Sequence, residues 1–359
     1  MDDKLYWLAL NMVPGIGPVA FRNLLATFDD PKSVLLASPR TLGSVNGIGE
    51  KTIRAIKDTS SLKFAEKESR RAQELGIAVV TLRDGMYPKN LLQIYDPPPV
   101  LYVRGRLTED DSLAVSIVGS RKSSPYGRSV TKRLSHDLAS IGIRVVSGMA
   151  RGIDTVAHHG ALEARGRTIA VLGCGADVIY PRENKKLFFD IIDNGAIISE
   201  FPLATPPEGK NFPKRNRIIS GLSLGVVIVE AAADSGSLIT ATHALEQGRE
   251  VFAIPGNVGA STSQGTNRLI KQGAKLIEGA EDVIEEIAPQ CERQVPREAP
   301  PVLSNEEQGI LDLLSHTPIH IDEISRKSQM EIHRVSVILL DLELKGLVCQ
   351  LGGKTFVLR

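Results

Sequence analysis

The chain has 359 residues, an apolar fraction of 42%, few aromatic residues and a formal net charge of +1. This length predicts two or three domains, of which the largest buries a full hydrophobic core. The charge near zero excludes a protein that attracts nucleic acid over its whole surface, so an anion site has to be local.

The three cysteines are scattered, and no two of them have the spacing of a metal or disulfide pair: Cys174, Cys291 and Cys349. This pattern argues against a disulfide framework and against zinc, and it suits a reducing cytoplasm. The first residues lack a cationic leader, and no apolar run of about 18 residues follows. We therefore expect no signal peptide, no membrane span and a cytoplasmic location.

Residues 1–65 predict a small helical domain with an internal repeat. The segments "VPGIGPVAFRNLL" (13–25) and "VNGIGEKTIRAI" (45–56) share V-x-G-I-G before a helix. Such glycines let backbone N–H groups approach an anion at a helix N-terminus. The pattern resembles the helix-hairpin-helix motif, which implies contact with a DNA backbone; the alternative is a purely structural turn. Few cations flank the two turns: Arg22, Lys51 and Arg54.

Residues 66–288 predict one larger α/β domain. Its first part, to residue 110, reads as a helix, a strand and a proline-rich extended run that enters a second strand. From residue 111 a short apolar strand, a glycine or serine loop and a helix then alternate repeatedly. Strands that are apolar at consecutive positions are covered on both faces, and this alternation predicts a mostly parallel, Rossmann-like sheet.

Five loops that follow predicted strands hold the candidate ligand-binding residues. Because ligands of such sheets bind at the carboxyl ends of the strands, these loops are expected to share one edge. Their glycines permit close approach, and their Arg side chains match phosphate oxygens, so we predict a phosphate or polyanion site. The candidates are Gly119, Ser120, Arg121, Lys122, Gly148, Arg151, Arg182, Asn184, Lys185, Lys214, Asn216, Arg217, Gly236 and Ser237.

Plainer interpretations stand beside this one. Loop cations, including those of "KRNR" (214–217), are often solvated surface, and Arg151 with Asp154 has the spacing of a loop ion pair or helix cap. Glu200 and Glu230 follow strands, where they are either general bases or anchors for the arginines. Cys174 follows a buried strand and is interpreted as a core residue. The same interpretation applies to histidines without a partner at metal spacing, namely His158, His159 and His243.

Several motifs of cofactor or catalytic sites are missing. No acidic residue follows the first glycine loop at the spacing that holds a ribose. There is no P-loop lysine, and no carboxylate cluster suited to two-metal chemistry. We therefore predict no cofactor, no metal and no enzymatic activity.

Several segments together closely resemble the DNA-processing protein A family, also called DprA or Smf, over residues 80–288. They include "SIVGSRKSSPYG", "SGMARGIDTVAHHGAL", "ISEFP", "FPKRNRIISGLS" and "GTNRLIKQGAKLI". The resemblance implies a single-stranded DNA-binding recombination mediator that protects incoming DNA, displaces single-strand-binding protein and loads RecA during natural transformation. It also implies a homodimer formed through the central domain. The family's pocket residues match Arg121, Arg182, Asn216 and Arg217, whereas no motif identifies residues that contact RecA.

Residues 289–302 are proline and charge rich and predict a linker, followed by a winged-helix domain over 303–359. Ser304 and Glu307 form a capping pattern, and a Gly-Gly turn closes a final hairpin. The third predicted helix, near 331–345, mixes charges of both signs. We therefore favour a protein-interaction role over duplex reading for this domain.

Two other functions remain as alternatives. A nucleotide phosphoribohydrolase of related fold needs a P-G-G-x-G-T-x-x-E loop, where this chain has "EAAADSGSLITATHAL". A structural DNA-bridging protein would use only its terminal domains, on duplex DNA. Since the predicted edge has few aromatic residues, binding to a single strand is expected to rest on phosphate contacts and to depend strongly on salt.

Overall fold

A computed structural model describes residues 3–292, 303–315, 318–345, 347–351 and 353–358. The chain divides into two units between residues 294 and 295, and each is described by itself. Within the described residues, no helix is long and apolar enough to cross a membrane.

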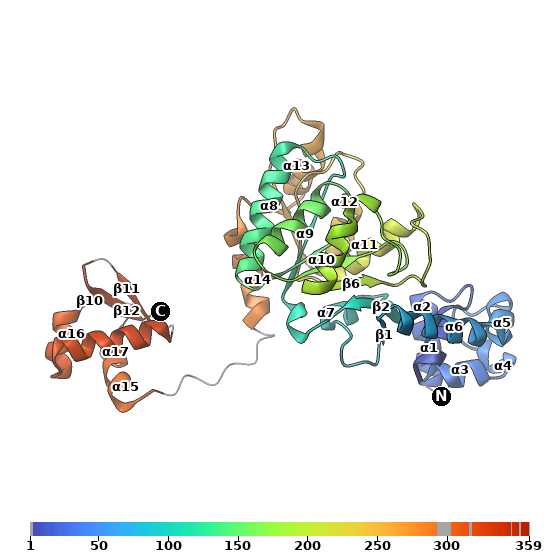
Figure 1. Ribbon diagram of the computed structural model, residues 1–359, viewed down its shortest axis with the longest axis horizontal. Helices are drawn as coiled ribbons and strands as arrows, with labels where there is room; N and C mark the ends of the chain where they lie inside the picture. The colour runs from blue at the N-terminus through green and yellow to red at the C-terminus, as the bar shows by residue number, and fades with distance from the viewer. Residues whose placement is uncertain (1–2, 293–302, 316–317, 346, 352, 359) are drawn as a thin grey trace. The chain divides into compact units, whose positions relative to one another are not determined.

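The first unit opens with six helices, drawn in blue in Figure 1: α1 (Asp3–Asn11), α2 (Pro18–Phe28), α3 (Pro31–Leu36), α4 (Pro39–Leu42), α5 (Glu50–Lys57) and α6 (Ser60–Glu74). The two repeat turns have matching backbones. Gly15 and Gly47 have positive φ, at 90° and 84°, and Gly17 and Gly49 are the extended N-caps of α2 and α5. Only glycine adopts the first conformation readily, which explains the repeated motif.

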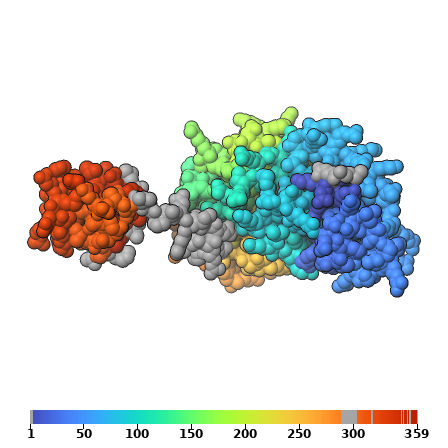
Figure 2. Space-filling model, turned by 90° about the horizontal axis from the view of Figure 1, so that it is seen from below, coloured from blue at the N-terminus to red at the C-terminus, as the bar shows by residue number. Residues whose placement is uncertain are grey.

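These helices pack onto the sheet domain rather than standing apart. Their core residues Trp7, Phe21 and Leu24 belong to one buried cluster with Ile77 and Tyr102 of the sheet. In the space-filling view the blue helical segment lies directly against the paler segment that follows it (Figure 2). The domain boundary predicted at residue 65 falls inside α6 and stays a prediction.

A nine-stranded sheet forms the centre of this unit, with strand order β1-β2-β6-β5-β4-β3-β7-β8-β9. The strands are β1 (Ile77–Thr81), β2 (Val100–Gly105), β3 (Ala114–Val118), β4 (Arg144–Ser147), β5 (Thr168–Val171), β6 (Gly195–Ser199), β7 (Gly225–Ile228), β8 (Glu250–Ala253) and β9 (Lys275–Leu276). From β6 to β9 all neighbours are parallel, while β1 and β2 pair antiparallel. The predicted mostly parallel, Rossmann-like sheet is confirmed.

Helices cover both faces of the sheet: α7 (Lys89–Leu92), α8 (Pro125–Ser140), α9 (Ile153–Glu163), α10 (Lys185–Asn194), α11 (Asn211–Gly221), α12 (Ser237–Glu246), α13 (Gln264–Lys271) and α14 (Ala280–Glu292). Side chains of β3 alternate between the faces, as period two requires. Val115 and Ile117 join the core with α8, α9 and α14, whereas Ala114 and Val118 join the core with α11 and α12. Helix α14 runs into the predicted linker as far as Glu292, and residues 293–302 lie outside the described residues.

A switch in strand order fixes where a ligand can bind. After β3 the chain adds β4, β5 and β6 on one side, and then returns to place β7 on the other side of β3. The loops that leave β3 and β7 therefore diverge to opposite sides. Open α/β sheets bind ligands in the crevice that such a switch leaves at the carboxyl ends of the strands.

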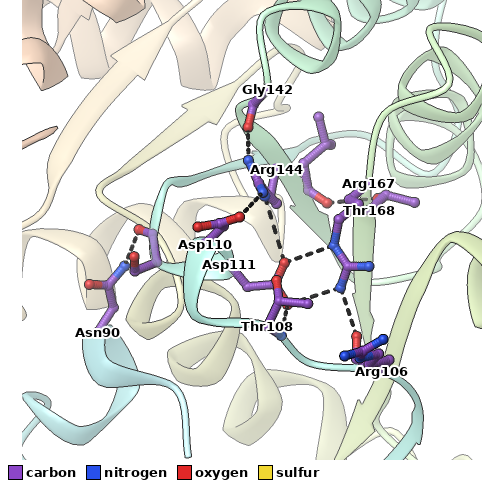
Figure 3. Close-up of polar contacts among 11 residues, drawn as sticks. Asn90, Arg106, Thr108, Asp110, Asp111, Gly142, Arg144, Arg167 and Thr168 are labelled. Carbon is purple, nitrogen blue, oxygen red and sulfur yellow. Dashed lines mark hydrogen bonds and ion pairs between the residues drawn. The ribbon is translucent and has the colours of Figure 1, made fainter. Parts of the chain in front are cut away.

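At the opposite edge of the sheet, around the amino ends of β4 and β5, an ion-pair cluster clamps the segment before β3 (Figure 3). The buried carboxylate of Asp111 lies 3.0 Å from Nε of Arg167 and 3.7 Å from Nε of Arg144, while Asp110 lies 3.2 Å from Arg144 Nη2. Asp111 also forms a capping box with Thr108. These arginines are paired with carboxylates and hold the fold together.

The second unit is a small winged helix, as predicted. It contains α15 (Asn305–Leu311), β10 (Ile319–His320), α16 (Ile321–Ser328), α17 (Ile332–Leu344), β11 (Val348–Leu351) and β12 (Thr355–Leu358). The three strands form an antiparallel sheet in the order β10-β12-β11. The predicted capping box is present, because Ser304 and Glu307 satisfy each other's backbone N–H groups.

Candidate nucleic-acid interface at the switch point

A pocket of about 520 Å³ lies at the switch point, and it is called the rim pocket below. Four of the five predicted loops line it: those after β3, β4 and β7, and the loop that leads into α11. It brings together half of the predicted residues, namely Gly119, Ser120, Arg121, Lys122, Asn216, Gly236 and Ser237.

The first loop is held in place by Glu230, which follows β7. The backbone N–H of Ser124 donates to this carboxylate over 2.9 Å, and the Ser124 hydroxyl donates to it as well. The same hydroxyl caps α8 by accepting from Gly127 N–H, and a Cβ at Gly127 would lie 2.4 Å from Glu230. Glu230 is therefore neither a general base facing the pocket nor an anchor for an arginine. It positions the loop backbone.

The second loop packs directly beneath the first. Gly152 has a φ of 78°, and a Cβ there would lie 2.3 Å from the backbone carbonyl oxygen of Ser120. Such contact excludes every side chain larger than hydrogen. The close packing of the two loops fixes the backbone from which Arg121 projects.

Arg121 is exposed at the mouth of the pocket and lies over an aromatic ring. Its guanidinium carbon is 5.1 Å from the centroid of Phe212, which in turn packs against Tyr180 at 5.6 Å. No carboxylate of the described residues forms an ion pair with Arg121. The Arg121 cation is therefore available to a phosphate.

A buried arginine forms the floor of the pocket. Arg215 Nη1 donates to the carbonyl oxygens of Gly148, at 2.7 Å, and Val171. A Cβ at Gly148 would lie 2.4 Å from Nη1, so the absence of a side chain at this position makes room for the guanidinium. Burial lowers the pKa of Arg215 to about 10, which leaves it charged at neutral pH.

Asp154, also on the pocket wall, is the acidic partner in this environment. Burial raises its pKa to about 6, and nearby Arg215 partly offsets this effect. Its carboxylate accepts from the backbone N–H groups of Gly148 and Ala150, at 3.2 and 3.3 Å. It therefore does not pair with Arg151. Arg151 instead forms an exposed ion pair with Glu183 of the third loop.

The other predicted residues lie outside the rim pocket. Asn184 is buried and donates to Met149 O and Thr155 Oγ1, which joins the second and third loops. Lys214 and Arg217 lie on the other side of α11, and Arg217 contacts Asp96 at 2.9 Å and Glu200 at 2.6 Å. Glu200 is thus an arginine anchor, one of its two predicted roles. Two predicted cations of the third loop are exposed beyond the pocket, namely Arg182 and Lys185.

Among the pocket residues outside the predicted set, the three that bear most on its chemistry are Phe212, Arg215 and Asp154. For Phe212 and Arg215, helical spacing was the signal in the sequence that could have identified them. Phe212, Arg215 and Asn216 have the i, i+3, i+4 spacing that places side chains on one face of a helix. The pattern was obscured because "KNFPKRNR" contains a proline and reads as a loop.

The suspected reactive side chains are packing residues. Cys174 is buried, which raises the pKa of its thiol to about 11. Buried His158 contacts Thr168 Oγ1 through Nδ1 over 2.7 Å, and burial lowers its pKa to about 3. His243 pairs with Glu246 on the surface of α12. Within the described part of the chain, no group of three or more His, Cys, Asp or Glu residues is arranged to hold a metal ion.

Three family models match the chain in order. Residues 78–288 match the DNA recombination-mediator protein A model, residues 294–354 the DprA winged helix domain, and residues 8–60 a SAM-like helix-hairpin-helix tandem. The chain belongs to the DNA recombination-mediator protein A family. This confirms the predicted resemblance and assigns a family to both terminal domains.

Individual relatives agree with the family models. The chain is 36% identical to the protein Smf of Synechocystis, over 99% of this chain and 98% of the relative. It is 45% identical to DprA of Bacillus subtilis, over 60% of this chain and 73% of the relative. Its structure resembles DprA of Streptococcus pneumoniae with a TM-score of 0.68 at 33% identity, covering 80% of this chain and 98% of the other. DprA of Helicobacter pylori, studied for its single-stranded DNA binding mode, matches with a TM-score of 0.53 at 34% identity. This match covers 59% of this chain and 96% of the other.

Proposed function

We propose that this chain is a single-stranded DNA-binding recombination mediator that holds the DNA backbone in the rim pocket. It protects incoming strands during natural transformation and loads the RecA recombinase onto them. The observation that supports this most is Arg121, a cation without a carboxylate partner, held over Phe212 at the mouth of a glycine-lined pocket.

The chemistry of the pocket favours a nucleic-acid strand over a free anion. Arg121 and Lys122 supply charge for phosphate, and the N-terminus of α12, at Gly236 and Ser237, adds the positive end of a helix dipole to the pocket wall. Phe212 supplies a ring for stacking. Single-strand binders combine such a cationic groove with aromatic platforms, and they show little base preference.

Phosphoribohydrolase activity is the alternative, and Asp154 is the residue on which it would depend. This carboxylate lines the pocket, but two backbone N–H groups and Arg215 hold it in place. We propose that it stabilises the loop after β4 and that the protein is not an enzyme. Release of free base from nucleoside 5′-monophosphates by the wild type, lost in Asp154→Asn, would instead establish the hydrolase.

The winged helix is proposed to bind protein. Arg334 of α17, a cation that a duplex-reading helix would direct at DNA, pairs with Glu306. The same helix exposes apolar side chains, namely Ile332, Val337 and Leu340. RecA and single-strand-binding protein are proposed as partners of the whole chain. The proposed homodimer forms through the central domain, and the cytoplasm is the proposed location.

The direct test compares single-stranded with duplex DNA binding for the wild type and for Arg121→Ala/Arg182→Ala. We expect tight binding of the single strand that falls at least tenfold in the double variant, since each lost charged contact is worth about 1.5–3 kcal/mol. Assembly of RecA on strands coated with single-strand-binding protein then tests the mediator role. A preference for duplex, or binding that survives the double substitution, would place the function in the terminal domains.

A further inference from the structure

A second pocket, of about 600 Å³, lies on the other side of α11 and is called the side pocket below. Its walls come from the first helix-hairpin-helix turn, the proline run before β2, the segment after β6, and α11 and α12. The residues used below are Ile16, Pro18, Pro98, Phe201, Lys214 and Arg217. None of the functions discussed so far uses this pocket.

Helix α11 is the wall between the two pockets. Phe212, Arg215 and Asn216 line the rim pocket, Lys214 and Arg217 line the side pocket, and Pro213 lines both. An α-helix with its side chains is about 10 Å across, so neighbouring nucleotides of a stretched strand can reach from one pocket to the other. The side pocket thus lies within reach of a strand whose phosphates the rim pocket holds.

The lining of the side pocket suits a base better than a phosphate. Ile16, Pro18, Pro98 and Phe201 offer apolar surface and one ring for stacking. The carboxylates of Asp96 and Glu200 also face this site and disfavour an anion. A flat, neutral group with hydrogen-bonding edges fits such walls.

Arg217 supplies an unused donor at this site. The side chain is only 9% exposed, and Nε and Nη2 are occupied by Asp96 and Glu200. Its Nη1 has no hydrogen-bond partner among the described residues, although it is buried. A buried donor without a partner costs about 1–3 kcal/mol, and a small shift of the guanidinium toward the pocket would let a carbonyl oxygen or ring nitrogen of a base satisfy it.

We propose that the side pocket receives a nucleobase of the bound single strand, turned away from the phosphates that the rim pocket holds. This proposal rests on the proposed single-strand binding. Phe201 stacks on the base, Arg217 donates to its edge, and the first helix-hairpin-helix turn forms the facing wall. The turn therefore participates through Ile16 and Pro18, rather than by gripping a phosphate with its glycines.

The test measures binding of two strands of equal length, one of deoxythymidine and one in which every nucleotide is an abasic tetrahydrofuran. In Phe201→Ala we expect an approximately tenfold loss of affinity for the thymidine strand, typical of a lost stacking contact, and no change for the abasic strand. The matched control Phe64→Ala removes an exposed ring of α6 and should change neither.

Further arms keep the test decisive. Melting temperatures confirm that each variant is folded, and His243→Trp, which fills the pocket mouth from α12, should reproduce the selective loss if Phe201→Ala is unfolded. Photocrosslinking with 5-iododeoxyuridine should modify Phe201. Equal losses for both strands, or no loss for either, would overturn the base pocket. If the wild type bound neither strand, the proposed function itself would be rejected instead.

Discussion

The two edges of the central sheet use arginine in opposite ways. At the amino-end edge, Arg144 and Arg167 converge on Asp111 and leave little free charge. At the carboxyl-end rim, Arg121 faces an open pocket without a carboxylate partner. Both edges are rich in cations, so residue type alone does not distinguish them. The difference is whether a carboxylate occupies the guanidinium.

Arginine's partners therefore separate structural from functional positions within the predicted set as well. Arg217 is occupied on two sides by Asp96 and Glu200, and Arg151 is occupied by Glu183. Arg121 is the predicted arginine that the rim pocket leaves available. The predictions below test this distinction, beginning with the largest effect.

Removing the carboxylate of the amino-end edge should destabilise the fold without changing the site. Asp111→Ala leaves the partly buried guanidinium of Arg167 without a carboxylate and leaves Arg144 with only the exposed Asp110, and we expect about 3 kcal/mol less unfolding free energy in urea titration. The matched control Asp110→Ala removes an exposed carboxylate and should cost at most about 0.5 kcal/mol. Affinity of the folded Asp111→Ala protein for a single strand should equal that of the wild type; a large loss would show that the two edges are coupled.

Asp154 should make stability depend on pH. Its pKa is about 6 when folded and near 3.8 when unfolded, so the folded state holds the proton more tightly. The resulting stability is fully present below about pH 3.8 and is lost as pH rises through 6. In Asp154→Asn this loss is absent. Between pH 4 and 7 the wild type should therefore lose on the order of 2–3 kcal/mol relative to the variant. Parallel stability curves would contradict the assigned pKa.

Moving the loop that holds Arg121 should weaken binding without removing a charge. Gly152→Ala places a Cβ against the Ser120 carbonyl in a left-handed backbone, and we expect about 2 kcal/mol lower stability. Single-strand affinity should fall severalfold because Arg121 is displaced. Gly236→Ala is the control for stability, since its Cβ meets no atom within 4 Å and φ is not positive. Unchanged affinity in Gly152→Ala would mean that the loop position does not matter.

Releasing an occupied arginine should have the smallest effect. Glu183→Gln frees Arg151 at the exposed border between the second and third loops. Because surface ion pairs are weak, we expect about a twofold gain in single-strand affinity at low salt, measured by fluorescence anisotropy. The gain should disappear at high salt. A loss of affinity would show that Glu183 itself contacts the ligand.

The fold was predictable because its signals are local. Apolar strands followed by glycine loops identified the seven parallel strands, and the Ser304–Glu307 capping pattern located α15. The site was only half predictable. Sequence order shows that Arg121 and Arg217 follow strands, but it does not show that α11 turns Arg217 away from the rim toward Asp96, a residue 121 positions earlier. The contact between Gly148 and Arg215, which leaves no room for a Cβ at position 148, is likewise tertiary and has no local sequence signal.

The most direct test of the central claim is the salt dependence of single-strand binding for the wild type, Arg121→Ala and Arg106→Ala. Arg106 is an exposed arginine near the amino-end edge and matches Arg121 in charge. We predict that Arg121→Ala lowers affinity about tenfold at 0.1 M salt and makes the plot of log K against log salt shallower by about 0.7, the value for one phosphate contact on a single strand. Arg106→Ala should follow the wild type. Equal behaviour of both variants, or a loss confined to Arg106→Ala, would contradict binding at the carboxyl-end rim.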